Sequence, residues 1–456
     1  MGDDSFDRPG RAVPSGRLAR LGVFGRLAGG VAGGMVAEGT RRLASGQRPR
    51  LGDLLLTPGN VGRLADQLAH LRGAAMKLGQ MISMDAGDML PPELADIMAR
   101  LRDKASPMPP AQLQQVLNAQ WGAGWRTRFA RFEASPIAAA SIGQVHRATT
   151  HDGRVLAIKV QYPGVAASID ADVDNVATLL RVSGLLPAGL DVAPLLAEAK
   201  RQLAEEADYV REGQQLSRYA TLLDGDPRFV VPALEPAFTT AQVLAMDFVP
   251  GVGIETLVDA AQDVRDRVAA TMIDLVLREL FAFGVMQTDP NFGNYRWQAG
   301  ADGKGGRIVL LDFGAARDVS PTTAGAYREL LTAALSGSRD AVRVAAVEAG
   351  LLAPVVVERH RAGIDRMIDV VLAEMNRPGP FDFGDRSFVG PLREEGTALA
   401  SDRATWHLPP VDMLFVQRKI SGTALLAARL KARVDVRAMV AERLQKRADP
   451  AKPTEN

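Results

Sequence analysis

The stretch QTDPNFGNYRW, residues 287–297, sets Asp289 and Asn294 five positions apart, and IVLLDFGAAR, residues 308–317, then carries Asp312. The second stretch begins with apolar residues, which is typical of a short buried strand, so Asp312 is expected where a strand ends. We therefore expect two carboxylates and one side-chain amide to converge on one place. Hard oxygen ligands of this kind suit Mg²⁺, which keeps several water molecules and bridges substrate phosphates.

The order and spacing of these residues resemble those of a protein-kinase active site. In protein kinases a catalytic aspartate precedes a metal-binding asparagine at this separation, and an Asp-Phe-Gly motif follows. We therefore assign Asp289 to catalysis, and Asn294 and Asp312 to Mg²⁺ binding. A second Asp-Phe-Gly, at 382–384, follows a Pro-Gly-Pro run and no apolar strand, and we interpret it as an ordinary turn.

Composition excludes several other kinds of site. The chain of 456 residues is 47% hydrophobic and 23% charged, enough for a two-lobed core with an additional helical layer. A formal net charge of +1 argues against a nucleic-acid partner. The absence of cysteine suits a reducing compartment, and no order of residues typical of a secretory signal begins the sequence. A zinc site is not expected, because the histidines lack the paired spacing of zinc ligands. They are His70, His146, His151, His360 and His407.

The lysine that holds the α- and β-phosphates in a kinase lies on a strand and is oriented by an acidic residue of a helix. The β-prone run RVLAIKV, residues 154–160, contains Lys159 as its only lysine and matches the V-A-I-K pattern. A lysine also commonly lies on an exposed strand face, but its place ahead of the two motifs above favours phosphate binding. The acidic partner is expected on one helix over 191–223, and we select Glu212.

A nucleotide-binding loop is expected directly before this strand. Where kinases carry G-x-G-x-x-G, the chain has AAASIGQV at 138–145, so alanine replaces glycine. Because alanine disfavours positive φ and adds a methyl group at closest approach, the loop should be stiffer than a glycine loop. The residues expected to contact the nucleotide here are Ala138, Ala139, Ala140, Ser141, Ile142 and Gly143. A strand over 242–248 should lead into a hinge at 249–251, with Met246 and Phe248 lining the adenine pocket.

Three motifs carry a family resemblance: the AAASIGQV loop, Lys77-Leu78-Gly79-Gln80 and Glu206-Ala207-Asp208-Tyr209. Together they resemble the signatures of the UbiB atypical kinases, and the match covers most of the chain. The QTDPNFGN loop further resembles the mitochondrial and proteobacterial branch that supports coenzyme Q (ubiquinone) biosynthesis. The resemblance implies an α+β, two-lobed protein-kinase-like fold with a family-specific N-terminal helical extension.

The resemblance also implies a role for that extension. Lys77 and Gln80 would lie on it, folded over the active site, and would interrupt an otherwise apolar helical run over 64–84. In that arrangement Glu206 and Asp208 hold Lys77, while Glu212 holds Lys159. The alternative for Lys77 and Gln80 is a solvated helix face, which is the usual location of such residues.

Three functions stay open at this point. An extension over the active site would obstruct a peptide substrate, which favours transfer of phosphate from ATP to water or a small molecule by an ATPase-like enzyme coupled to membrane lipid. The main enzymatic alternative is a protein kinase that phosphorylates a partner. The alternative from another class is a module that uses ATP to present a polyprenyl lipid to other ubiquinone-biosynthesis proteins. A catalytically dead scaffold is disfavoured, because every metal and phosphate residue is present.

The N-terminal arm is rich in arginine. Residues 11–50 contain eight arginines against one glutamate, interleaved with apolar residues, which predicts a helix that binds an anionic membrane surface. A flexible or core-docking arm is an equal alternative. No apolar stretch is long enough for a transmembrane helix, so we expect a cytoplasmic protein, peripheral on the inner face of a bacterial membrane. The expected domains are an arm (1–50), a helical extension with the K-x-G-Q motif (51–120), a small lobe (121–250), a mostly helical large lobe (251–445) and a tail (446–456).

Overall fold

The computed structural model describes residues 107–140, 142–182, 193–300, 305–402 and 409–446. Lys77, Gln80, Ser141 and the arginine-rich arm lie outside the described residues. The chain divides into two compact units. The first unit runs up to Arg218 and includes Pro232–Val249, and the second comprises Tyr219–Val231 and the chain from Pro250 onward. The division at Val249 and Pro250 falls inside the stretch expected as the hinge.

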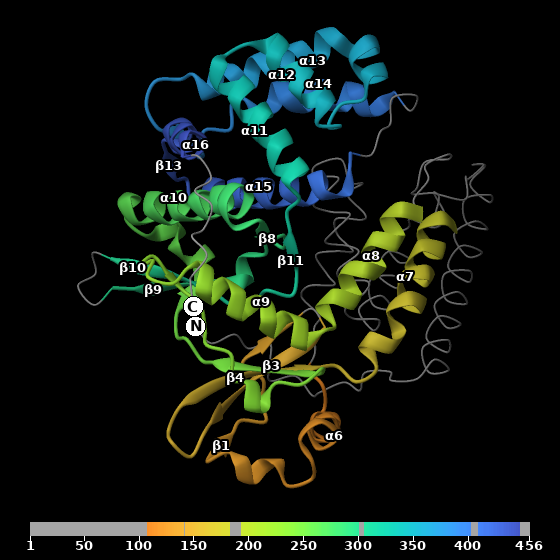
Figure 1. Cartoon of the computed structure of the whole chain (residues 1–456), viewed down its shortest axis with the longest axis vertical. Helices are drawn as coiled ribbons and strands as arrows, with labels where there is room; N and C mark the ends of the chain where they lie inside the picture. The colour runs from red at the N-terminus through yellow and green to blue at the C-terminus, as the bar shows by residue number, and fades with distance from the viewer. Residues whose placement is uncertain (1–106, 141, 183–192, 301–304, 403–408, 447–456) are drawn as a thin grey trace, which may run out of the picture. The chain divides into compact units, whose positions relative to one another are not determined.

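The first unit is built on an antiparallel sheet with the order β1-β3-β4-β6, to which β2 adds by pairing with β3 (Figure 1). Its strands are β1 (Arg131–Phe132), β2 (Ala138–Ala139), β3 (Gly143–Thr149), β4 (Val155–Gln161) and β6 (Val243–Asp247). β4 is buried over nearly its whole length, which fits its β-branched and apolar sequence VLAIKVQ.

The core of the first unit lies between this sheet and α6 (Pro110–Trp121), with the 3₁₀ turns Trp125–Arg128 and Pro236–Phe238. Pro110 occupies the first turn of α6, where its missing amide hydrogen costs no helical bond. Aromatic rings close the core: Trp125 and Phe132 pack edge-on with ring centroids 4.8 Å apart, and Phe129 and Phe238 lie 4.6 Å apart. α6 lies within the range expected for the helical extension, and its buried side chains pack in this core.

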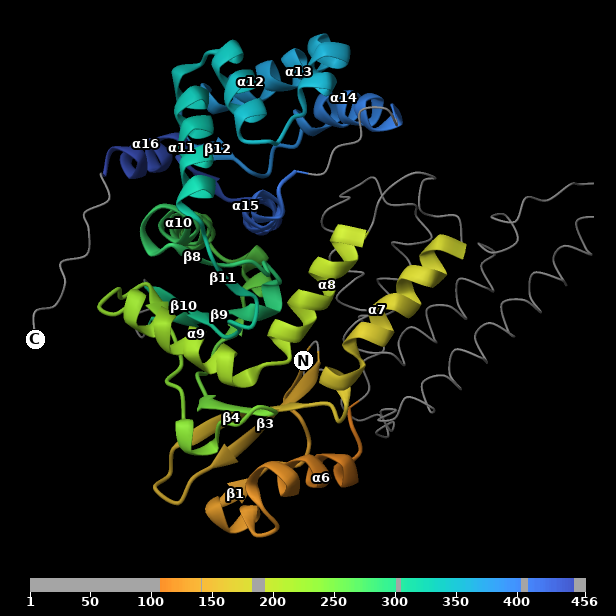
Figure 2. The same ribbon diagram turned by 45° about the vertical axis from the view of Figure 1, so that its right-hand side comes forward.

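Three helices follow the sheet strand β4: α7 (Val165–Val182), α8 (Ala193–Glu206) and α9 (Tyr209–Leu222). α7 and α8 run side by side in both views (Figures 1 and 2). The expectation of one helix over 191–223 is wrong, because the helix breaks at 207–208. There Asp208 caps the new helix, its Oδ1 accepting a hydrogen bond from the Arg211 amide at 3.0 Å. The division between the two units falls within α9.

The second unit contains small sheets and a larger set of helices. One sheet has the order β5-β10-β9-β7, in which only the β5–β10 pair is parallel, and a second sheet pairs β8 with β11. The strands are β5 (Phe229–Val230), β7 (Val252–Gly253), β8 (Val285–Gln287), β9 (Tyr295–Ala299), β10 (Gly306–Leu310), β11 (Ala316–Asp318), β12 (Phe381–Asp382) and β13 (Arg433–Val434). The β8–β11 pair brackets both motifs of the expected catalytic site.

The helices of the second unit are α10 (Gln262–Arg278), α11 (Pro321–Ser336), α12 (Arg339–Glu348), α13 (Pro354–Met375), α14 (Val389–Ser401), α15 (Val411–Arg429) and α16 (Val436–Gln445), with 3₁₀ turns at Ile254–Asp259 and Phe292–Asn294. α10 continues into a π-helical turn, Glu279–Phe283, which ends at Gly284 in the left-handed conformation (φ 62°). α15 lies beside α10 in both views (Figures 1 and 2). No helix within the part of the chain that the structure describes combines the length and apolar character needed to cross a bilayer.

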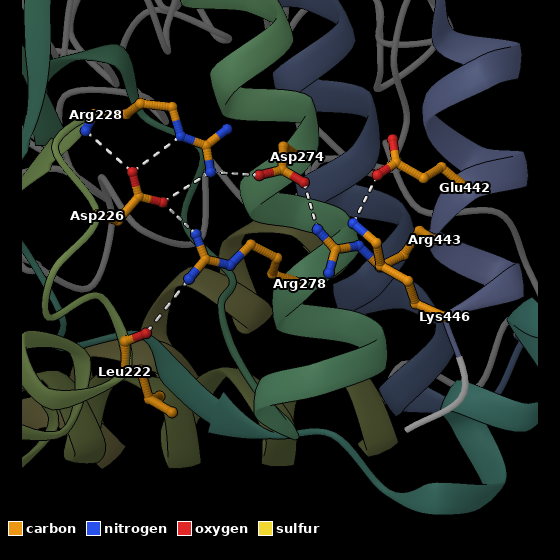
Figure 3. Close-up of polar contacts among 8 residues, drawn as sticks. All are labelled: Leu222, Asp226, Arg228, Asp274, Arg278, Glu442, Arg443 and Lys446. Atoms are coloured by element: carbon orange, nitrogen blue, oxygen red, sulfur yellow. Dashed lines mark hydrogen bonds and ion pairs between the residues drawn. The ribbon is translucent and has the colours of Figure 1, made fainter. Parts of the chain in front are cut away.

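A network of charges joins α10 to α16 and to the segment before β5 (Figure 3). Asp226 pairs with Arg228 at 2.7 Å and with Arg278 at 2.6 Å, and Asp274 pairs with Arg228 at 2.8 Å and with Arg443 at 2.6 Å. The hydrogen bond from Arg228 holds the pKa of Asp226 well below its usual range. This network contains no expected site residue, and we interpret it as structural.

Candidate active site

Lys159 and Glu212 form a buried ion pair in the first unit. Lys159 Nζ donates to both carboxylate oxygens of Glu212, at 2.8 and 2.9 Å, and the two side chains are 8% and 1% exposed. The ammonium also lies 5.1 Å from the centroid of the Tyr209 ring. β4 supplies the lysine and α9 supplies both partners, although 53 positions separate Lys159 from Glu212. The pair has the arrangement that orients a phosphate-binding lysine in kinases.

The alanine-rich loop is the hairpin between β2 and β3. Ala138 and Ala139 pair with β3, and the Ala140 amide donates to the carbonyl oxygen of Gly143 at 2.9 Å, which closes a tight turn. Gly143 is needed for close packing, because a Cβ there would lie 2.4 Å from the Val160 oxygen and 2.8 Å from Tyr209 Oη. Ile142 is 1% exposed and its carbonyl accepts from Tyr162, so its side chain belongs to the core and does not face a nucleotide.

The expected adenine contacts lie at the end of β6. Met246 is buried and pairs with Ala157 of β4. The Phe248 amide donates to the carbonyl oxygen of Val155 at 2.9 Å, and the Phe248 ring lies under the Arg147 guanidinium. The Phe248 amide is therefore engaged in the sheet and does not point to a base, and Pro250 has no amide hydrogen to offer.

The expected catalytic loop, residues 288–294, lies between β8 and β9 in the second unit. Thr288 fixes its start, because both its amide and its hydroxyl donate to the carbonyl oxygen of Ala315, at 3.2 and 2.9 Å. Asn294 fixes its end, because its Nδ2 donates to the carbonyl oxygen of Asp289 at 3.2 Å. Asp289 and Asn294 are both partly exposed, so a ligand can reach them. A side-chain bond across the five-residue separation thus closes the loop.

The Asp-Phe-Gly motif is joined to this loop. The Leu311 amide donates to the carbonyl oxygen of Asn294 at 3.0 Å, which places Asp312 next to the end of the catalytic loop. Asp312 Oδ1 accepts from the Gly314 amide at 3.0 Å, and the carboxylate is partly exposed. Phe313 is buried, with its ring centroid 4.8 Å from that of Tyr219.

The second Asp-Phe-Gly copy has the same local turn but a different setting. Asp382 Oδ1 accepts from the Gly384 amide at 2.8 Å, which matches the turn at Asp312. Asp382 lies on β12, however, and pairs with Arg433 of β13 at 3.1 Å. The turn itself is therefore common to both copies, and the surrounding catalytic loop distinguishes the first.

The residues expected to hold Mg²⁺ fit that ion in their chemistry. Asn294 and Asp312 offer hard oxygen atoms, and the Asn294 amide nitrogen is engaged with Asp289, which leaves Oδ1 as the atom suited to a cation. No cluster of three or more histidine and acidic side chains with metal-binding geometry occurs among the described residues. Mg²⁺ in phosphoryl-transfer enzymes commonly takes its remaining ligands from phosphate and water.

The acids expected to hold Lys77 lie where α8 ends and α9 begins. Glu206 is buried and Asp208 is exposed, with Asp208 engaged as the cap of α9. Their expected partners, Lys77 and Gln80, lie outside the described residues. Their roles, like those of the other site residues, stay predictions.

A second buried lysine was not expected from the sequence. Lys419 of α15 and Glu279 of the π-helical turn are both 0% exposed, with Lys419 Nζ 3.5 Å from Glu279 Oε2. Burial raises the pKa of Glu279, against the opposing effect of Lys419. Tyr219 Oη donates to Glu279 Oε1 at 2.7 Å. The one signal in the sequence is a lysine placed at helical spacing between Phe415 and Leu426.

Residues 100–346 match the model of the ABC1 atypical kinase-like domain. The chain belongs to this atypical kinase family. It is similar to the mitochondrial atypical kinase COQ8B of Danio rerio, with 36% identity over 433 residues, 94% of this chain and 68% of that protein. It is similar to the mitochondrial atypical kinase COQ8 of Saccharomyces cerevisiae, with 35% identity over 429 residues, 93% of this chain and 84% of that protein.

Among solved structures, the chain resembles Rv3197 of Mycobacterium tuberculosis, solved in complex with erythromycin. The TM-score is 0.57 and the identity 26%, over 84% of this chain and 94% of that one. These likenesses confirm the resemblance to the UbiB atypical kinases and the kinase-like α+β fold. The protein is therefore an atypical kinase of the phosphotransferase class.

Proposed function

We propose that this atypical kinase transfers the γ-phosphate of ATP in a Mg²⁺-dependent reaction that supports ubiquinone biosynthesis. The observation that carries the proposal is the joining of the two motifs in the second unit. Asn294 holds the Asp289 carbonyl through its side chain and accepts the Leu311 amide through its own carbonyl, beside Asp312. A general acid–base residue and two metal-ligand candidates are thus fixed by one set of hydrogen bonds.

Each of the expected site residues would have a separate role in phosphoryl transfer. Lys159, oriented by Glu212, would hold the α- and β-phosphates. Asn294 and Asp312 would hold Mg²⁺, which neutralises the charge of the phosphate oxygens when bound. Backbone groups of Ala138–Ala139 and Gly143 would lie along the phosphates, while Met246 would contact the base. Because Phe248 is engaged with Val155, its contribution would be limited to its side chain and carbonyl.

Asp289 would orient the acceptor and take its proton. The bond between the β,γ-bridging oxygen and the γ-phosphorus breaks as a bond forms between that phosphorus and the acceptor oxygen, and ADP leaves. The acceptor proton passes to the Asp289 carboxylate. Little covalent chemistry falls to the protein, so positioning and electrostatic stabilisation would supply most of the rate enhancement.

Water or a small molecule is the acceptor that we propose, because the helical extension would cover the peptide groove. In this arrangement the extension, 51–120, would fold over the active site, and Lys77 and Gln80 would lie on it with Glu206 and Asp208 as partners of Lys77. Lys77→Ala is then expected to fold and to gain autophosphorylation. Unchanged nucleotide binding and no autophosphorylation would make Lys77 an ordinary surface residue.

The link to ubiquinone rests on the likeness to COQ8 atypical kinases and on the QTDPNFGN loop. We further propose that the arginine-rich arm at 11–50 attaches the protein to the inner face of the membrane, where polyprenyl lipids and other ubiquinone-biosynthesis proteins would be its partners.

The test is the fate of labelled γ-phosphate in purified protein with Mg²⁺, with and without vesicles containing anionic lipid. Release as free phosphate that rises with the vesicles supports a membrane-coupled ATPase. Label appearing on an added partner protein supports the protein-kinase alternative. Mg²⁺-dependent ATP binding without release, accompanied by lipid extraction from the vesicles, supports the lipid-presenting module.

A further inference from the structure

α15 meets the catalytic loop at Gly422. A Cβ at this position would lie 2.2 Å from Pro290 Cγ and 2.3 Å from Pro290 Cβ, where ordinary contacts are 3.4–4 Å. Pro290 is buried and directly follows Asp289. A glycine inside a helix is destabilising by about 0.5–1 kcal/mol relative to alanine. Its presence in α15 is explained by this contact, because only glycine lets the loop lie against the helix.

Lys419 lies one turn earlier on the same face of α15. Its Nζ donates to Gln287 Oε1 at 3.3 Å and to Tyr295 Oη at 3.1 Å. Gln287 stands two residues before Asp289, and Tyr295 directly follows Asn294. One ammonium group therefore bonds to the residues on both sides of the catalytic loop, while Gly422 contacts Pro290 near the start of the loop.

Glu279 completes this arrangement from the end of α10. Its Oε1 accepts from the Gln287 amide at 3.1 Å, and Lys419 provides the opposite charge. Glu279 opens the π-helical turn, and its side chain is 0% exposed. Such a buried pair adds little stability over an apolar packing of similar volume, because removing both charges from water is costly. A positioning role accounts for its presence better than stability does.

We propose that Lys419 and Gly422 are positioning residues of α15 that set the catalytic loop for phosphoryl transfer. The inference rests on the proposed function, since it assigns further residues to the same reaction. In-line transfer depends on placement, and a displacement of about 1 Å can lower a rate about 100-fold. The methyl group of an alanine at 422 would have to move Pro290 by at least that amount to restore an ordinary contact.

The decisive variant is Gly422→Ala, which adds one methyl group and changes no charge. We expect kcat for ATP turnover to fall about 100-fold, while KM for ATP stays within about threefold. Amide hydrogen exchange should become faster in the peptide covering 287–295 and stay unchanged elsewhere. Gly325→Ala in α11 is the matched control, because a Cβ at this helical glycine meets no atom within 4 Å. It should leave kcat, KM and exchange as in the wild type.

Lys419→Met with Glu279→Gln supplies a second test in which no unpaired buried charge remains. This double variant should fold, keep KM and lose kcat, whereas a purely structural pair would leave kcat unchanged in the folded fraction. Wild-type exchange over 287–295 in Gly422→Ala, or equal loss of kcat in Gly325→Ala, would overturn the positioning role. A wild-type protein without Mg²⁺-dependent turnover would instead overturn the proposed function, and the exchange experiment would still decide whether α15 positions the loop.

Discussion

The two units each contain a buried lysine–glutamate pair, and the pairs differ in what can reach them. Lys159 Nζ donates to both oxygens of Glu212, at 2.8 and 2.9 Å, and its side chain is 8% exposed. Lys419 Nζ lies 3.5 Å from Glu279, and both side chains are fully buried. The first lysine retains a small exposed area, through which the proposed phosphate would be bound, whereas the second lysine has none.

The difference separates two uses of a buried charge. In the first pair, under the proposed function, the acid would orient the lysine for a phosphate ligand. In the second pair Lys419 Nζ donates to Gln287 Oε1 at 3.3 Å and to Tyr295 Oη at 3.1 Å. This lysine therefore binds residues that flank the catalytic loop of its own chain. A lysine–glutamate pair thus indicates either a binding site or a support, and its accessibility and other partners decide which.

The largest effect should come from removing the accessible lysine. Lys159→Met is expected to lower Mg²⁺-dependent ATP turnover at least about 100- to 1,000-fold, because a charge aimed at the phosphates is lost. Because the Glu212 side chain is 1% exposed, the variant should also lose stability, so turnover is compared for the folded protein. Steady-state turnover together with circular dichroism checks this. Turnover close to that of the wild type would show that Lys159, like Lys419, supports the structure and does not bind phosphate.

Disrupting the Lys419–Glu279 pair should first lower the stability of the fold. Lys419→Met leaves Glu279 buried without its opposite charge and should lower the free energy of unfolding by about 3–5 kcal/mol. Adding Glu279→Gln should recover most of that loss, because no buried charge then remains. Urea unfolding of both variants measures the two values. Additive losses in the double variant would show that the two residues do not act as a pair.

His146 is a buried group without a charged partner, so its contribution to stability should depend on pH. Burial lowers the pKa of His146 from 6.5 to about 4, and its Nδ1 donates to the Glu133 carbonyl while Nε2 accepts from Gln144. The orientation of Gln144 follows from its Oε1, which accepts from the Met108 amide. A proton on Nε2 would therefore face a donor, and the neutral ring is the form that the fold accommodates.

The sign of the pH effect follows from the two pKa values. The unfolded chain binds the His146 proton near pH 6.5 and the folded chain only near pH 4, so stability is lost as the pH falls between these values. The full change corresponds to about 3 kcal/mol. His146→Gln should lose this part of the pH dependence, as measured by urea unfolding at pH 7 and pH 4.5. A variant with the wild-type pH dependence would contradict the assignment.

The expected catalytic motifs could be picked out from the sequence because their chemistry is local, and their roles stay predictions. Asp289, Asn294 and Asp312 lie within short stretches whose residue types and spacing point to metal-assisted phosphoryl transfer. The kinase-like α+β fold was implied by the family resemblance and is confirmed. Glu212 could be selected because a phosphate-binding lysine on a strand is oriented by an acidic residue on a helix. The predicted helix over 191–223 was wrong, since Asp208 caps a new helix and periodicity alone does not register such a break.

The supporting residues could not be predicted in the same way. Lys419 and Gly422 lie more than 100 positions after the loop that they contact, and neither belongs to a motif. A lysine and a glycine within an apolar helix are ordinary at the level of sequence. Their role depends on the register in which α15 packs against β8 and β9, which local pattern does not determine.

The most direct test of the central claim compares the two Asp-Phe-Gly copies. Asp312→Asn and Asp382→Asn make the same change in the same local turn, but only Asp312 adjoins the catalytic loop. We predict that Mg²⁺-dependent ATP turnover is abolished in Asp312→Asn and preserved in Asp382→Asn, with both proteins folded. Full turnover in Asp312→Asn would contradict the assignment of this site to phosphoryl transfer.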